Sequence, residues 1–131
     1  MEDREFLAAF EAGTLPEELF HHRNHVRAGW LVLREVPPAF ALARFSSALR
    51  RFASRLGKAD RYHETITWAY LLLINERMER TGRRGSWQEF ADTNPDLLTW
   101  RGTVLRSYYR DETLQSELAR RVFLLPDRLL K

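Results

Sequence analysis

The sequence predicts an all-α fold, a single domain over residues 1–131 in which three longer helices and several short ones form a bundle. Apolar residues recur at steps of three and four along most of the chain, and prolines and helix-capping residues separate these stretches. No segment alternates with a period of two for long enough to predict a strand. A chain of 131 residues is long enough to form one hydrophobic core and too short to form two.

One helix is predicted before Gly13 and a second helix after it. The first has apolar residues on one side at Phe6, Leu7 and Phe10. Gly13 ends it, and Thr14 is placed to cap a second helix with Pro16 in its first turn. This second helix should extend to the proline pair Pro37-Pro38, because a residue before proline is pushed out of the helical conformation.

The third and fourth helices carry the strongest apolar patterns. From Pro38 to Gly57 one amphipathic helix buries a stripe formed by Leu42, Phe45, Leu49, Phe52 and Leu56. A fourth helix from about Arg61 to Arg80 is apolar nearly all round, so we expect it at the centre of the bundle. Short helices follow, beginning near Ser86, at Asn94-Pro95 and near Asp111.

Composition excludes several kinds of chemistry. Cysteine is absent, so disulfides, thiolate metal sites and cysteine nucleophiles are excluded. No apolar run is long enough to span a bilayer, and the acidic N-terminus lacks the pattern of a secretion signal, so we expect no membrane association and a cytoplasmic location. The net charge is +3, and only Lys58 and Lys131 of the 21 basic residues are lysines, which is weak support for an anionic partner.

Three of the four histidines lie close together within the second helix. His22 falls where the buried stripe of Leu15, Leu19, Val26, Trp30 and Leu33 requires an apolar residue. His25 follows one turn later and shares that face, whereas His21 points elsewhere and is expected in solvent. Two histidines on a buried face indicate a polar pocket or a hydrogen-bonded structural pair.

The fourth histidine opens the most apolar helix. If the second and fourth helices pack so that their histidine-bearing segments lie together, then His22, His25, His63 and Glu64 meet. Three imidazoles and a carboxylate suit a divalent metal such as Zn²⁺, Fe²⁺, Mn²⁺ or Ni²⁺. His63 and Glu64 are then also the candidates for catalytic proton transfer. Tyr62 is placed to hydrogen-bond to this site, although H-x-x-H spacing is permissive and Glu64 also suits a helix cap.

The two histidine motifs, with the ending "SYYRDETLQSELARRVFLLPD", resemble a family of small uncharacterised bacterial all-helical proteins. The family pattern is Phe-x-His-Arg-Asp-His with a following Arg and Trp, and later Tyr-His-Glu-Thr. It matches Phe20, His22, Arg23, His25, Arg27, Trp30, Tyr62, His63, Glu64 and Thr65, and leaves out His21. The resemblance makes Tyr62, Arg27 and Trp30 candidate ligand-binding residues. Asn24 replaces the usual Asp, and Arg110 replaces a common Ser.

Two functions stay open on the sequence alone. The protein is a metal-dependent or acid-base enzyme acting on a small molecule, or it is a non-catalytic binding or oligomerisation module whose histidines form a structural network. Nucleic-acid binding through the arginines ranks last, because acidic residues are interspersed and no recognition motif is present.

Overall fold

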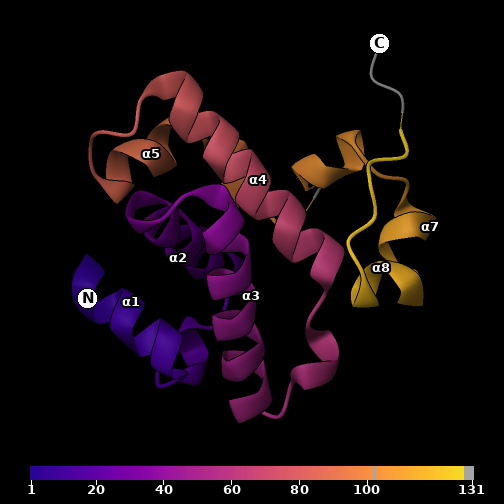
Figure 1. The fold of residues 1–131 in the computed structure, drawn as a ribbon, viewed down its shortest axis with the longest axis horizontal. Helices are drawn as coiled ribbons and strands as arrows, with labels where there is room; N and C mark the ends of the chain where they lie inside the picture. The colour runs from indigo at the N-terminus through magenta and orange to yellow at the C-terminus, as the bar shows by residue number, and fades with distance from the viewer. Residues whose placement is uncertain (102, 129–131) are drawn as a thin grey trace.

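The computed structural model describes residues 1–101 and 103–128, and this part of the chain contains helices and no strand, which confirms the all-α class (Figure 1). The longer helices are α1 (Asp3–Ala12), α2 (His22–Glu35), α3 (Pro38–Arg55), α4 (Glu64–Thr81) and α5 (Trp87–Thr93). The short ones are η1 (Glu17–Leu19), η2 (Ala59–Arg61), α6 (Pro95–Leu98), η3 (Val104–Ser107), α7 (Asp111–Leu114) and α8 (Glu117–Arg121). None of these helices combines the length and apolarity needed to cross a membrane.

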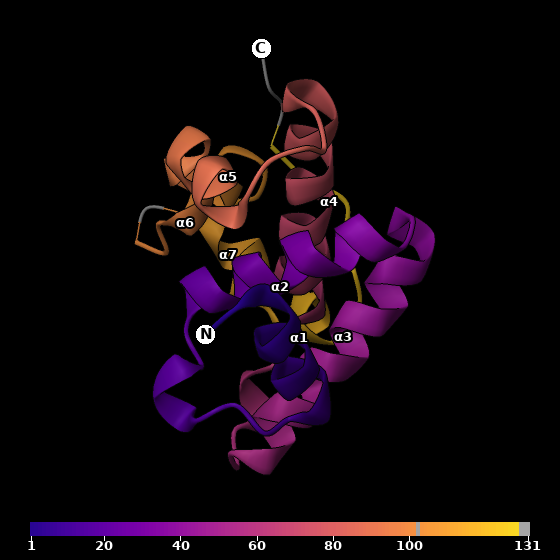
Figure 2. The same cartoon turned by 90° about the vertical axis from the view of Figure 1, so that its left-hand side faces the viewer.

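Helix α4 has the central position predicted for it. Helices α2 and α3 pack against it, and η3 and α8 from the C-terminal third contact it as well. Figure 2 shows α5 and α6 on one side of α4, with α3 on the other. Phe45, Leu49 and Phe52 of the α3 stripe are buried as predicted, whereas Leu42 and Ile66 are only partly buried at the edge of the core.

The second helix begins later than predicted. The chain forms the short turn η1 and then leaves helical geometry, with His21 extended at φ −144° and ψ 166° as the N-cap of α2. The Phe20 ring packs edge-on against Phe52, 4.6 Å between centroids, which accounts for the break. Because helix formation restarts at His22, three histidines lie at the beginning of α2 rather than in its middle.

The segment after α8 is fixed to the beginning of α4 by one buried threonine. The Thr65 hydroxyl donates to the Val122 carbonyl at 2.8 Å and accepts the Leu124 amide at 3.1 Å. The Tyr109 hydroxyl donates to the Leu124 carbonyl at 2.7 Å. The C-terminal third is thereby held next to the residues that open α4.

Candidate functional site

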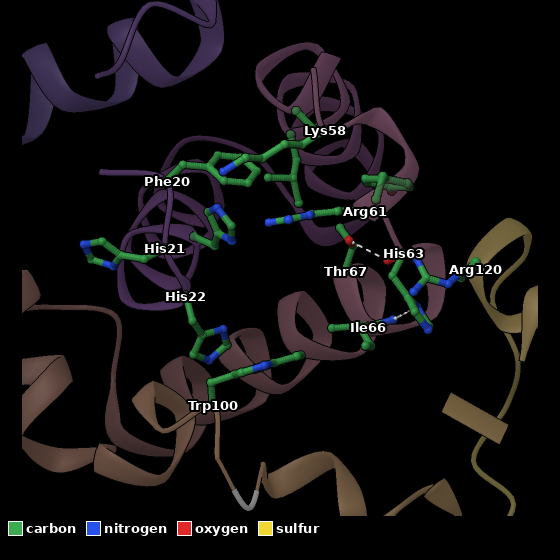
Figure 3. Close-up of a pocket in the computed structure, with 14 residues that line it drawn as sticks. Phe20, His21, His22, Lys58, Arg61, His63, Ile66, Thr67, Trp100 and Arg120 are labelled. Carbon is green, nitrogen blue, oxygen red and sulfur yellow. Dashed lines mark hydrogen bonds between the residues drawn. The ribbon is translucent and has the colours of Figure 1, made fainter. Parts of the chain in front are cut away.

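A pocket of about 370 Å³ lies where the beginnings of α2 and α4 meet the α3–α4 connection and the C-terminal third (Figure 3). Its walls come from segments that are far apart in the sequence. The lining residues are Phe20, His21, His22, His25, Leu49, Ala53, Lys58, Arg61, Tyr62, His63, Ile66, Thr67, Trp100 and Arg120. Of the predicted site residues, His22, His25 and His63 all line this one pocket.

His63 is held by the backbone through both ring nitrogens. Its Nε2 donates to the Leu114 carbonyl at 2.7 Å, and its Nδ1 accepts the Ile66 amide at 3.1 Å as the N-cap of α4. Burial lowers the pKa of His63, and the bond to Leu114 opposes this shift. A neutral imidazole with both nitrogens engaged has no lone pair left for a metal or for proton transfer.

His22 uses one ring nitrogen and lies among aromatic rings. Its Nε2 donates to the Leu97 carbonyl at 2.8 Å, and its ring centroid lies 4.6 Å from that of Tyr70 and 5.2 Å from that of Trp100. Burial lowers the pKa of His22, so the ring is mainly neutral near pH 7.

His25 differs because its ring has no hydrogen-bond partner in the described structure. Its Nε2 is buried, although the residue as a whole is only partly covered, and the Phe20 ring lies edge-on at 4.7 Å between centroids. Burial lowers the pKa of His25 to about 3, with smaller contributions from His22 and His21. A buried polar atom without a partner is costly, so this nitrogen is a candidate contact for a ligand.

Glu64 does not line the pocket, contrary to the prediction. Its Oε1 accepts the Tyr62 hydroxyl at 2.5 Å and Arg50 at 3.3 Å. Burial, and then the bond to Glu64, raise the pKa of Tyr62. Within residues 1–101 and 103–128 no three His, Asp or Glu side chains are placed to hold a metal ion. The four predicted ligands, His22, His25, His63 and Glu64, therefore do not assemble into a metal centre in this structure.

Two other predicted ligand-binding residues have structural positions elsewhere. Arg27 joins α2 to the N-terminal segment, donating to Asp3 at 2.7 Å with its guanidinium 4.4 Å from the centroid of the Phe6 ring. Trp30 is buried against Trp87 at 5.9 Å between centroids. Of the three residues that the resemblance suggested, only Tyr62 lines the pocket.

Sequence reasoning missed the cations and part of the aromatic wall. Lys58 and Arg61 directly precede the His63 motif in "GKADRYHE". A basic loop beside a histidine motif was the sequence signal that could have indicated a cationic pocket. Trp100 and Arg120 come from distant segments, so no local pattern marks them. His21 was expected in solvent and is exposed, but it also lines the pocket because it precedes α2 in an extended conformation.

Charge in the pocket is of one sign. Three cationic side chains line it, and no carboxylate of the described chain does. Lys58 pairs with Glu17 at 3.1 Å, and Arg120 donates to the Asp60 carbonyl at 3.0 Å. Arg61 makes no hydrogen bond or ion pair with any residue that the structure describes, and Figure 3 shows it reaching across the pocket toward α2.

No protein-family model, curated protein or solved structure matches this chain. The resemblance drawn from the histidine motifs therefore stays a prediction.

Proposed function

We propose that the protein binds a small anionic molecule in this pocket. The observation that carries the proposal is the lining itself, in which Lys58, Arg61 and Arg120 face one space with no carboxylate among the described lining residues. Such cations in a partly enclosed pocket attract a carboxylate or phosphate more strongly than they would in open solvent.

Arg61 is the expected anchor. Lys58 and Arg120 each already have a protein partner, whereas the Arg61 guanidinium has none among the described residues and can form a bidentate pair with an oxyanion. The neutral His25 ring lines the same space, and its buried Nε2 has no hydrogen-bond partner among the described residues. His63 serves a different purpose in this proposal, since its bond to Leu114 holds the C-terminal third in place.

In this proposal His63 has the structural role predicted for the histidines, and His25 has the predicted role beside a ligand. A volume of about 370 Å³ is within the usual range for small-molecule sites. A catalytic step is not required by this arrangement, and the proposal is limited to binding.

The test is a titration of the ¹⁵N-labelled protein with inorganic phosphate and with benzoate at low ionic strength, followed by NMR. We expect shift changes at residues lining the pocket, and Arg61→Ala should weaken binding about tenfold or more. Arg84→Ala is the matched control, because Arg84 is exposed and does not line the pocket. The proposal would be overturned if neither phosphate nor benzoate binds, or if Arg61→Ala binds the anion with the same affinity as the wild type.

A further inference from the structure

Trp100 forms a wall that the anion proposal leaves unexplained. Its side chain is 51% exposed, although Trp100 packs beside His22 and Tyr70, 5.2 Å and 6.3 Å away between ring centroids. It lines the main pocket and also a second pocket of about 280 Å³. His63, Ile66 and Arg120 line both as well, so the two spaces adjoin along a shared wall.

The opposite edge of the main pocket is aromatic too. Figure 3 shows Phe20 and Trp100 on opposite sides of the pocket, with Arg61 extending into the region between them. A single exposed tryptophan on a protein surface needs no explanation. A half-exposed indole and a guanidinium without a partner among the described residues line one pocket, so they present an apolar planar surface and a cation to the same space.

We infer that the ligand of this pocket is an aromatic anion, a planar ring that carries a carboxylate or phosphate group. This inference rests on the proposed anion binding and adds the chemistry of the remainder of the ligand. The anionic group pairs with Arg61, and the ring lies against the exposed indole of Trp100. Aromatic rings in offset or edge-to-face contact gain stabilisation beyond the area they bury, which an aliphatic ring of equal size does not obtain.

The protonation of the pocket fits a ring-bearing anion. Burial lowers the pKa of His22, which lies directly beside Trp100, so the aromatic wall is uncharged near pH 7. Positive charge then comes from the long side chains of Lys58, Arg61 and Arg120, which line the same space. The pocket therefore offers an uncharged aromatic surface and cationic groups to one ligand, as the two ends of an aromatic acid require.

The experiment compares four probes by NMR titration of the full chain: benzoate, phenyl phosphate, cyclohexanecarboxylate and benzyl alcohol. Benzoate should bind roughly threefold to tenfold more tightly than cyclohexanecarboxylate, which has the charge without the aromatic ring. Benzyl alcohol, which has the ring without the charge, should bind more weakly than benzoate. Comparison of benzoate with phenyl phosphate identifies which anionic group the pocket prefers.

Variants of Trp100 assign the preference to this residue. In Trp100→Leu, the affinity for benzoate should be nearly equal to the affinity for cyclohexanecarboxylate. Trp100→Phe should retain most of the wild-type difference between these two affinities. Because the side chain is half exposed, both variants should keep the wild-type fold, which the NMR spectrum itself reports.

The outcomes separate this inference from the proposed function. Equal affinity for benzoate and cyclohexanecarboxylate in the wild type, or an unchanged advantage in Trp100→Leu, would overturn the aromatic inference and leave anion binding in place. Failure of all three anions, or benzyl alcohol binding as tightly as benzoate, would overturn both.

Discussion

The three buried or half-buried histidines of the pocket differ in how many ring nitrogens are hydrogen-bonded. His63 engages both with backbone groups, His22 engages one, and His25 engages none within the described chain. An unsatisfied buried nitrogen costs about 1 to 3 kcal/mol, and a ligand that bonds to it recovers part of this. The same residue type therefore stabilises the fold at position 63 and leaves binding capacity at position 25.

His25 gives the folded protein a specific pH dependence. Its pKa is about 3 when folded, against an ordinary value of 6.5, so below pH 6.5 the unfolded chain binds a proton that the folded chain does not. Stability should therefore fall as the pH decreases from 6.5 toward 3. The lowered pKa values of His22 and His63 act in the same direction.

Urea denaturation at pH 7 and pH 5 tests this. The loss of unfolding free energy between these pH values should be smaller in His25→Gln than in the wild type, by about 2 kcal/mol. The exposed Arg84, which does not line the pocket, provides the control, since Arg84→Gln should lose as much as the wild type. Equal losses in His25→Gln and the wild type would show that His25 is not held neutral by the fold.

At the scale of the elements, α2 packs closely against α4 at Gly29. A Cβ atom at this position would lie 3.1 Å from Leu71 Cδ1 and 3.2 Å from Ile74 Cδ1, and both of those side chains are buried. A glycine that costs helix propensity is thus explained by packing.

Gly29→Ala should destabilise the protein by about 1 to 3 kcal/mol, because overpacking a fixed core outweighs the gain in helix propensity. Leu71→Ala creates space at the same point. The double variant should consequently be more stable than the sum of the two single losses implies, as measured by urea denaturation. A stabilising Gly29→Ala would mean that the two helices separate at little cost.

The apolar stripes predicted which faces of α2 and α3 are buried, because burial follows local spacing. The start of α2 was missed, because the Phe20 ring packs against Phe52, a contact between distant positions. The partners of His22 and His63 are the carbonyls of Leu97 and Leu114. Every residue has a backbone carbonyl, so no sequence pattern identifies which ones accept these bonds.

At the scale of the whole molecule, the C-terminal third closes the pocket and is itself held by a few polar contacts. Thr65 bonds to two backbone groups of residues 122–124, and the Trp68 and Phe123 rings stack at 5.2 Å between centroids. Arg120 enters the pocket from this third and bonds to the Asp60 carbonyl. The charge of the pocket therefore depends on the docking of a distant segment.

Thr65→Val keeps the shape of this fully buried side chain and removes its hydroxyl. It leaves the Val122 carbonyl and the Leu124 amide without this partner, so we expect a loss of about 1 to 3 kcal/mol. Hydrogen exchange at the Leu124 amide should accelerate as well. Thr81→Val is the control, since its exposed hydroxyl bonds only to the Arg77 carbonyl, and unchanged exchange at Leu124 in Thr65→Val would contradict the docking role.

The hydrogen bonds around the pocket join residues far apart in the sequence, so the pocket can form only late in synthesis of the chain. The bonds from His63 to Leu114, Thr65 to Val122, Arg120 to Asp60 and His22 to Leu97 span 51, 57, 60 and 75 positions. At about 5 to 20 residues per second, the ribosome needs about 4 to 15 s to add the residues between the last pair. Helices α1 to α3 can associate within that interval, whereas the pocket cannot close. A nascent chain released before residue 122 would thus contain the histidines of α2 but not the site they serve.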